Sequence, residues 1–243
     1  MRKTSLTVVA ACAMLLLVGT VHAKRKPPPP QPQAFPATGQ TTSYAAGDDG
    51  AIRAGAALSY TDNGDGTITD NNTKLMWEKK SGDTTLHNVN YIYSWAGLCS
   101  NNSTLCQTNA DCGVATPCAI TDGQGTGWTI FQWVAQLNAK HFAGHKDWRI
   151  PNVRELQSIV DYQNSNPAVE AAFNTNCAAA CTVTTCSCTQ SDVYWSATTY
   201  AGGTSYAWDV NFFNGFVDDV GYKPDGPIGY VRAVRDQSGD SHR

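Results

Sequence analysis

The residues most able to do chemistry in this sequence are eight cysteines that fall into two short clusters. The first cluster consists of Cys99, Cys106, Cys112 and Cys118, and the second of Cys177, Cys181, Cys186 and Cys188. Cysteines at such spacings can form disulfides, bind zinc or supply a reactive thiol. Disulfides are favoured over zinc because the number is even and paired Cys-x-x-Cys knuckles are missing. Each cluster allows three internal pairings, and the sequence does not choose among them.

The start of the chain predicts an oxidising compartment for these cysteines. A basic start precedes an apolar run over residues 6–18, and a small-residue cleavage site ends at Ala23. This pattern predicts a signal peptide over residues 1–23 and no transmembrane segment. A lipoprotein start at Cys12 is the alternative, but it would leave an apolar stretch on the mature chain. We therefore expect an exported protein in the periplasm, at the cell surface or secreted, where disulfides persist.

Composition divides the rest of the chain into a tether, a domain and a tail. Residues 24–56 are a proline-rich tether and an irregular lead-in, residues 57–236 form one domain, and residues 237–243 are a disordered tail. Loss of the signal peptide removes two of the 17 basic residues and none of the 20 acidic ones. The remaining excess of negative charge repels phosphate backbones, so nucleic acid is not an expected partner.

The elements that must position the cysteine clusters predict an α+β fold. Strands are expected at residues 58–62, 67–70, 75–77, 194–199, 206–211, 215–217 and 230–235, separated by Gly, Asn, Asp and Pro turns. Helices are expected at residues 129–144 and 152–160, with a shorter piece over 166–173. Thr129 and Asn152 are good N-caps for the two main helices. Because strands lie on both sides of the helices, the chain ends can share a sheet.

Six segments resemble the C-terminal domain family of the Legionella collagen-like protein, in the same order. They are TGQTTSY at 38–44, TDNGDGTITDNNTKLMW at 61–77, HFAGHKDWRIPNVRELQSIVDY at 141–162, YWSATTY at 194–200, AWDVNFFNG at 207–215 and YVRAVR at 230–235. The resemblance implies a C-type-lectin-like variant, related to the formylglycine-generating enzyme fold. Such a fold has antiparallel sheets, two main helices and long loops, stapled here by disulfides. It also implies export and adhesion to host or bacterial polymers.

An acid-rich turn is a candidate calcium site. Asp62, Asp65 and Asp70 alternate with Asn and Gly residues, and carboxylates so placed can wrap a hard cation. The spacing is not that of an EF-hand loop, and Asn-Gly and Asp-Gly are also what tight hairpins use. A structural turn is therefore the favoured interpretation, with calcium as the only cofactor considered.

A second charged group consists of Asp147, Arg149 and Glu155, at the start of the second predicted helix. Acids beside an arginine could be catalytic, but their place at a helix start favours an ion pair that fixes the loop to the helix. Gly-x-Ser-x-Gly and a convincing Ser-His-Asp set are both missing, so no catalytic residue is predicted.

Four aromatic residues are candidates for a ligand-facing patch, with ordinary sheet core as the alternative: Phe212, Phe213, Phe216 and Tyr222. Export, the tether and the stapled loops favour a non-catalytic binding or adhesion module whose ligand is an extracellular polysaccharide or surface protein. A structural component of an envelope assembly is the second hypothesis. An oxidase-like enzyme of the formylglycine-generating fold is the third, and it requires a free thiol. Homo-oligomers are compatible with all three.

Overall fold

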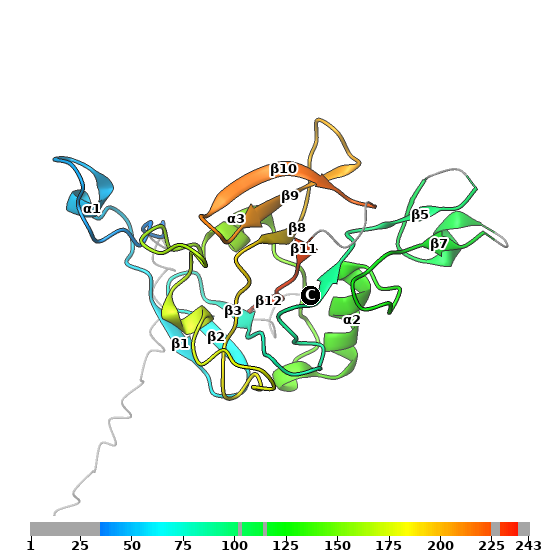
Figure 1. The fold of residues 1–243 in the computed structure, drawn as a ribbon, viewed down its shortest axis with the longest axis horizontal. Helices are drawn as coiled ribbons and strands as arrows, with labels where there is room; N and C mark the ends of the chain where they lie inside the picture. Colours follow the sequence, from blue (N-terminus) through cyan, green and yellow to red (C-terminus); the bar gives the residue numbers. More distant parts are fainter. Residues whose placement is uncertain (1–34, 102–103, 114–115, 225–228, 238–243) are drawn as a thin grey trace, which may run out of the picture. The chain divides into compact units, whose positions relative to one another are not determined.

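Strands dominate the part of the chain that the structure describes (Figure 1). The computed structural model describes residues 35–101, 104–113, 116–224 and 229–237, so the expected signal peptide and most of the tether and tail lie outside the described residues. The first sheet has the order β1-β2-β3-β12, formed by Tyr60–Asp62, Thr67–Asp70, Leu75–Glu78 and Val234–Asp236. The second has the order β10-β9-β8-β11-β4, formed by Phe216–Tyr222, Tyr206–Asn211, Val193–Thr199, Gly229–Tyr230 and Ile92–Tyr93. The third has the order β6-β5-β7, formed by Leu105–Cys106, Gly97–Cys99 and Cys118–Ala119.

The first sheet joins the two ends of the domain, as the sequence predicts. Strand β12 pairs antiparallel with β3, with Arg235 opposite Met76. Strands β1 and β2 form the expected hairpin, whose turn contains Gly64 and Gly66 at φ 77° and 97°. These positive φ angles are the conformation that Asn-Gly and Asp-Gly turns favour, so the local sequence closes this hairpin.

The predicted strand over residues 230–235 is wrong, because the segment is broken between two sheets. Strand β11 ends at Tyr230 and pairs in the second sheet, whereas β12 begins at Val234 in the first. Between them the Arg232 guanidinium donates to the carbonyl oxygens of Glu78 at 2.7 Å and Cys188 at 2.6 Å. The segment crosses the core with its side chains buried on both sides, so its alternation did not reflect one solvent face.

The first main helix, α2, is shorter than predicted. It spans Ile130–Ala139 and begins with a capping box in which Thr129 and Gln132 bond each other's backbone amides. The expected continuation to Gly144 is wrong, because His141 and Ala143 adopt left-handed conformations at φ 53° and 50°. A 3-10 turn over Phe142–Gly144 follows in place of further α-helix.

The second main helix, α3, is a single capped turn and a half over Val153–Gln157. Asn152 accepts hydrogen bonds from the amides of Arg154 and Glu155, as its N-cap role predicts. The third predicted piece is a 3-10 turn over Ala171–Phe173. The lead-in also contains a short helix, α1, over Asp49–Ile52, where irregular chain was expected. The fold is therefore mostly sheet with few helices, compatible with the α+β class.

Two aromatic-rich clusters form the core on either side of the second sheet. Trp77, Phe173 and Tyr194 lie in one cluster, and Trp133 and Trp195 lie in the other. Neighbouring residues on β8 thus point to opposite faces, as the pleat requires. Each buried indole N–H in the second cluster reaches a backbone carbonyl, as in the 2.8 Å bond from Trp195 to Tyr93. Those bonds fix the loop before β4 and β4 itself against the core.

Candidate binding surface and disulfide-bonded loops

All eight cysteines of the two clusters are paired in disulfides. The bridges are Cys99–Cys112, Cys106–Cys118, Cys177–Cys188 and Cys181–Cys186. The first two interleave along the chain and hold the three-stranded sheet β6-β5-β7, whereas the second pair is nested. In each loop the sulfurs themselves make up most of the small buried cluster. The bridges thus supply the stability that these polar loops cannot obtain from apolar burial.

A buried ionic network ties the second cysteine loop to the core. Glu78, at the end of β3, accepts from Lys80 at 3.3 Å and from the Ala233 amide at 3.0 Å, and contacts His87 at 2.8 Å. Burial opposes the ionisation of Glu78, but Lys80 and His87 outweigh it and hold its pKa below the ordinary value. Burial lowers the pKa of Lys80 in turn.

Arg232 completes this network without a salt bridge to any side chain that the structure describes. Its guanidinium bonds the backbone carbonyls of Glu78 and Cys188 and the Thr189 hydroxyl, at 2.7, 2.6 and 2.8 Å. The local sequence did not indicate this group, because Arg232 is distant in sequence from Glu78 and Lys80 and only the fold brings them together. Their burial is the unusual observation, since such residues are rarely enclosed unless paired.

The structure does not bring the three residues of the candidate calcium site together. Asp62 pairs with Lys79 at 2.7 Å, and Asp65 accepts from the amide and hydroxyl of Thr67 at 3.0 and 2.6 Å. Asp70 is buried and accepts from the amide of Asn72 at 2.8 Å. Each carboxylate therefore closes its own turn. Among the described residues, the groups whose ligand atoms converge consist of cysteines alone.

The three charged residues at the start of α3 belong to two separate ion pairs. Arg149 and Glu155 form a bidentate pair at 2.7 and 2.8 Å, and Glu155 also accepts from the Asn152 amide. Asp147 instead pairs with Arg235 of β12, at 2.7 and 3.1 Å. The Arg235 guanidinium holds the pKa of Asp147 below its ordinary value. Both pairs fasten this loop, one to the helix and one to the last strand.

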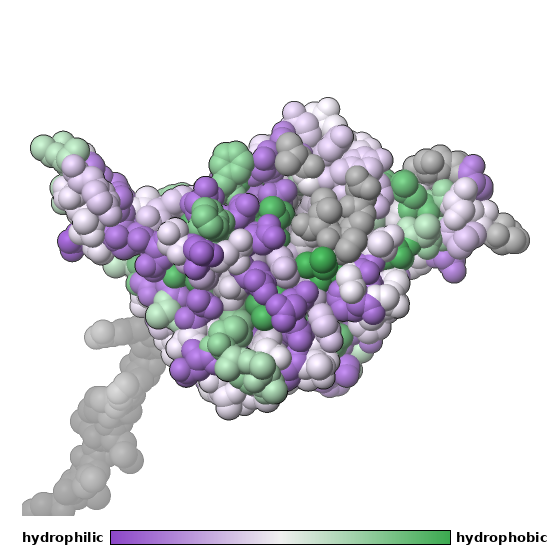
Figure 2. Space-filling view, viewed as in Figure 1, coloured by the Kyte–Doolittle hydropathy of each residue, from purple (hydrophilic) through white to green (hydrophobic). Residues whose placement is uncertain are grey.

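The four candidate ligand-facing aromatics are separated by the β9–β10 hairpin. Phe212 is buried in the core, and Tyr222 packs against Tyr206 at the far end of the hairpin, with ring centroids 5.4 Å apart. Phe213 and Phe216 lie at the turn and are 50% and 58% exposed. Hydrophobic residues form small separate groups on the mostly hydrophilic face seen in Figure 2. Exposed aromatic residues that gather in one turn of such a surface can mark an interaction site.

A hollow lies beside this turn and adds a third exposed aromatic residue. Its volume is about 340 Å³, and it is lined by Gln157, Tyr162, Asn214, Gly215, Phe216 and Val217. Tyr162 is 41% exposed, donates to the Gly215 carbonyl at 3.3 Å and accepts from Gln157 at 3.2 Å. Gly215 has φ 82° and lies so close to Tyr162 that a Cβ would overlap it. The turn and the segment after α3 thus form one preorganised surface.

A larger hollow adjoins the first through Gln157 and Tyr162. Its volume is about 880 Å³, and the lead-in residues Phe35–Thr38 form one wall against α3. A backbone bond from Tyr162 to Thr38 at 2.8 Å attaches the lead-in to the domain, and one from Ala37 to Ala56, also at 2.8 Å, closes the lead-in on itself. A surface with aromatic rings, side-chain amides and a volume in this range is typical of ligand sites.

A buried carboxyl in the second sheet is a further feature that the sequence did not indicate. Asp209 of β9 is 3% exposed and lies directly opposite Asp218 of β10. Burial, with smaller contributions from Asp218 and Asp219, raises the pKa of Asp209 to about 7. Among the described residues, none donates a hydrogen bond to its carboxylate.

The fold and the paired cysteines define a disulfide-stabilised domain of the kind found in extracellular or envelope proteins. The chain belongs to the Lcl C-terminal domain family, whose family model matches residues 66–235. No curated protein and no solved structure matches the chain. None of the helices in the described ranges has the length and hydropathy needed to cross a membrane.

Proposed function

We propose that this protein is an exported, non-catalytic binding module whose ligand is a polysaccharide. The surface formed by Tyr162, Phe213 and Phe216 carries the proposal. Sugar rings present apolar C–H faces that pack on exposed aromatic rings, and the amides of Gln157 and Asn214 can both donate to and accept from their hydroxyl groups. A C-type-lectin-like scaffold is part of the proposal, supported by the pairing of β3 with β12.

Family membership and the cysteine pairing support a binding role over an oxidase-like one. An oxidase-like enzyme of the formylglycine-generating fold requires a free thiol, and all eight cysteines from Cys99 to Cys188 are in disulfides. The preorganised turn at Gly215 is also suited to binding, because a rigid surface loses little conformational freedom when a ligand docks.

Replacement of Phe216 by alanine is expected to weaken polysaccharide binding about tenfold, equivalent to about 1.4 kcal/mol. The side chain is more than half exposed, so its loss removes ligand contacts while the core remains packed. The probes are a glycan array, followed by sedimentation with purified peptidoglycan, cellulose and chitin. Phe213→Ala is expected to act in the same direction.

Tyr206→Ala is the matched control for this test. Tyr206 is an aromatic residue on the same hairpin, 40% exposed, but it lies at the end away from the hollow. Binding should be unchanged in this variant, and thermal melting should be similar in all three. Flat responses of the folded parent on every polysaccharide, or equal losses in the Tyr206 and Phe216 variants, would exclude this surface as the site.

A further inference from the structure

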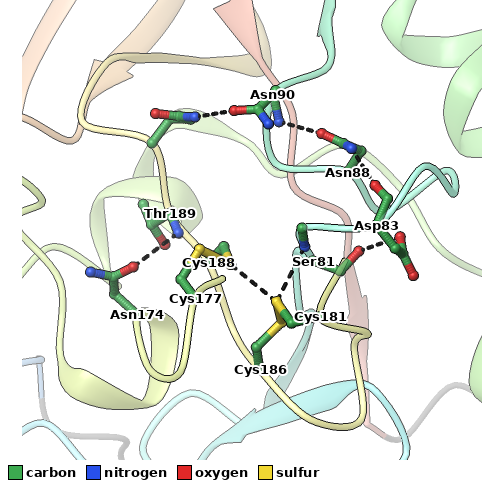
Figure 3. The surroundings of a disulfide bond; sticks show 12 residues. Ser81, Asp83, Asn88, Asn90, Asn174, Cys177, Cys181, Cys186, Cys188 and Thr189 are labelled. Atoms are coloured by element: carbon green, nitrogen blue, oxygen red, sulfur yellow. Dashed lines mark hydrogen bonds between the residues drawn. A yellow bond between two sulfur atoms is a disulfide. The ribbon is translucent and has the colours of Figure 1, made fainter. Parts of the chain in front are cut away.

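The nested disulfides of the second cysteine cluster touch each other. Cys181 and Cys188 belong to different bridges, yet their Sγ atoms are only 4.0 Å apart (Figure 3). The Sγ atoms of Cys181, Cys186 and Cys188 all lie within 4.8 Å of one another. A thiolate at any of these positions would therefore have a disulfide of the other bridge as its neighbour.

The four cysteines differ in their access to solvent. Cys177 is exposed, whereas its partner Cys188 and the neighbouring Cys186 are buried. A thiol from solution would reach the Cys177–Cys188 bridge at Cys177 and release Cys188 inside the cluster. The first cluster also has converging sulfurs, but Cys99, Cys106 and Cys112 are buried and Cys118 is only half-buried. Accessibility therefore distinguishes the second cluster from the first.

Hydrogen bonds hold Cys188 and its neighbour in place. Arg232 is buried and donates to the Cys188 carbonyl at 2.6 Å, which fixes the backbone of this residue. The Gly82 amide donates to Cys181 Sγ at 3.3 Å and so holds that sulfur in place next to Cys188.

We propose that this cluster is a thiol–disulfide exchange site whose substrates are low-molecular-weight thiols. The incoming thiolate attacks Cys177 Sγ, forms a mixed disulfide with it, and breaks the bond to Cys188, which leaves as a thiolate. Cys188 then attacks Cys181 Sγ, forms the Cys181–Cys188 bond, and breaks the bond to Cys186. The Cys186 thiolate takes a proton from water, so one external thiol is consumed and one internal thiol is produced. This modification goes beyond the proposed binding function and does not depend on it.

The test is incubation of the oxidised protein with reduced glutathione at neutral pH, followed by acid quenching, alkylation and peptide mapping by mass spectrometry. We expect glutathione on Cys177, a new Cys181–Cys188 crosslink and alkylated Cys186. Adducts on the four cysteines of the first cluster should be at least tenfold less abundant. Equal labelling of both clusters, or a Cys177 adduct with Cys181–Cys186 still intact, would overturn the proposal.

Two double variants separate the two steps. Cys181→Ser with Cys186→Ser should still accept glutathione at Cys177, but Cys188 should then be recovered alkylated because it has no bridge to attack. Cys177→Ser with Cys188→Ser should take up glutathione at least tenfold more slowly than the parent. Uptake at the parent's rate by this second variant would show that Cys177 is not the point of attack. Circular dichroism verifies that both variants are folded.

Discussion

Glu78→Gln is expected to lower the free energy of unfolding by about 3–5 kcal/mol at neutral pH, the range for removal of one partner from a buried ion pair. The substitution keeps the shape of the side chain but removes the only negative charge in contact with Lys80 among the described residues. Lys80 would then be left buried without a carboxylate partner, whereas Arg232 keeps its bonds to backbone carbonyls. Denaturant unfolding of the oxidised domain measures the loss.

Glu155→Gln is the matched control for this change. Glu155 also pairs with a cation, Arg149, but both side chains are partly exposed, so the expected loss is only about 0–1 kcal/mol. If Glu78→Gln does not fold, the double variant with Lys80→Met should regain stability, because it removes the unpaired charge as well. Similar losses for Glu78→Gln and Glu155→Gln would contradict the role given to burial.

The stability lost in Glu78→Gln should increase as the pH rises from acid to neutral. Because the folded protein lowers the pKa of Glu78, its contribution is present above the ordinary carboxyl pKa of about 4 and is lost as the pH falls through the lower, folded value. The difference between parent and Glu78→Gln is therefore largest at neutral pH and narrows in acid. A stability difference that increased as the pH fell would contradict a lowered pKa of Glu78 in the folded protein.

Asp209→Asn is expected to stabilise the protein by about 2 kcal/mol at pH 8 and to have little effect at pH 4. A pKa of about 7 in the folded state lies above the ordinary value of 3.8, so the folded domain favours the neutral carboxyl. The resulting penalty is absent below pH about 4, grows as the pH rises towards 7 and is complete above it. The full shift corresponds to about 4 kcal/mol, which we halve for residual solvent screening.

Thermal melting of the parent and Asp209→Asn across this pH range checks the prediction. Asp218→Asn serves as a control, because Asp218 is more exposed than Asp209 and should give a smaller gain. An asparagine variant that is less stable than the parent at pH 8 would mean that the Asp209 carboxylate has a favourable partner when ionised.

Local patterns predicted those elements whose geometry depends on their own residues. The β1–β2 hairpin and the caps at Thr129 and Asn152 follow from turn and capping chemistry within a few positions. The break between β11 and β12 could not be predicted in this way, since it depends on carbonyls of Glu78 and Cys188 that are distant in sequence. Residues 230–235 alternate in sequence as a single strand would, but side chains on both faces of the segment are buried, so the alternation did not mark one continuous strand.

The candidate sites were likewise predicted only where nearby residues determine them. The sequence predicted disulfides but left the pairing open, because each cluster places four cysteines within reach of one another. It grouped Phe212 and Phe213 with Phe216 and Tyr222, whereas the burial of Phe212 and the length of β10 separate them. Tyr162 was missed as a member of the aromatic surface, since it joins the turn only through the packing of Gly215.

The position of β12 has a consequence for the order in which the domain can fold during synthesis. A polypeptide threaded from its N-terminus presents β1, β2 and β3 early, but the partner of β3 arrives only with the last described residues of the domain. Arg232 and Arg235 arrive with it, so Glu78 and Asp147 wait for their arginine contacts until then. The first sheet and the contacts of Arg232 and Arg235 can therefore be completed only when the C-terminal segment is available.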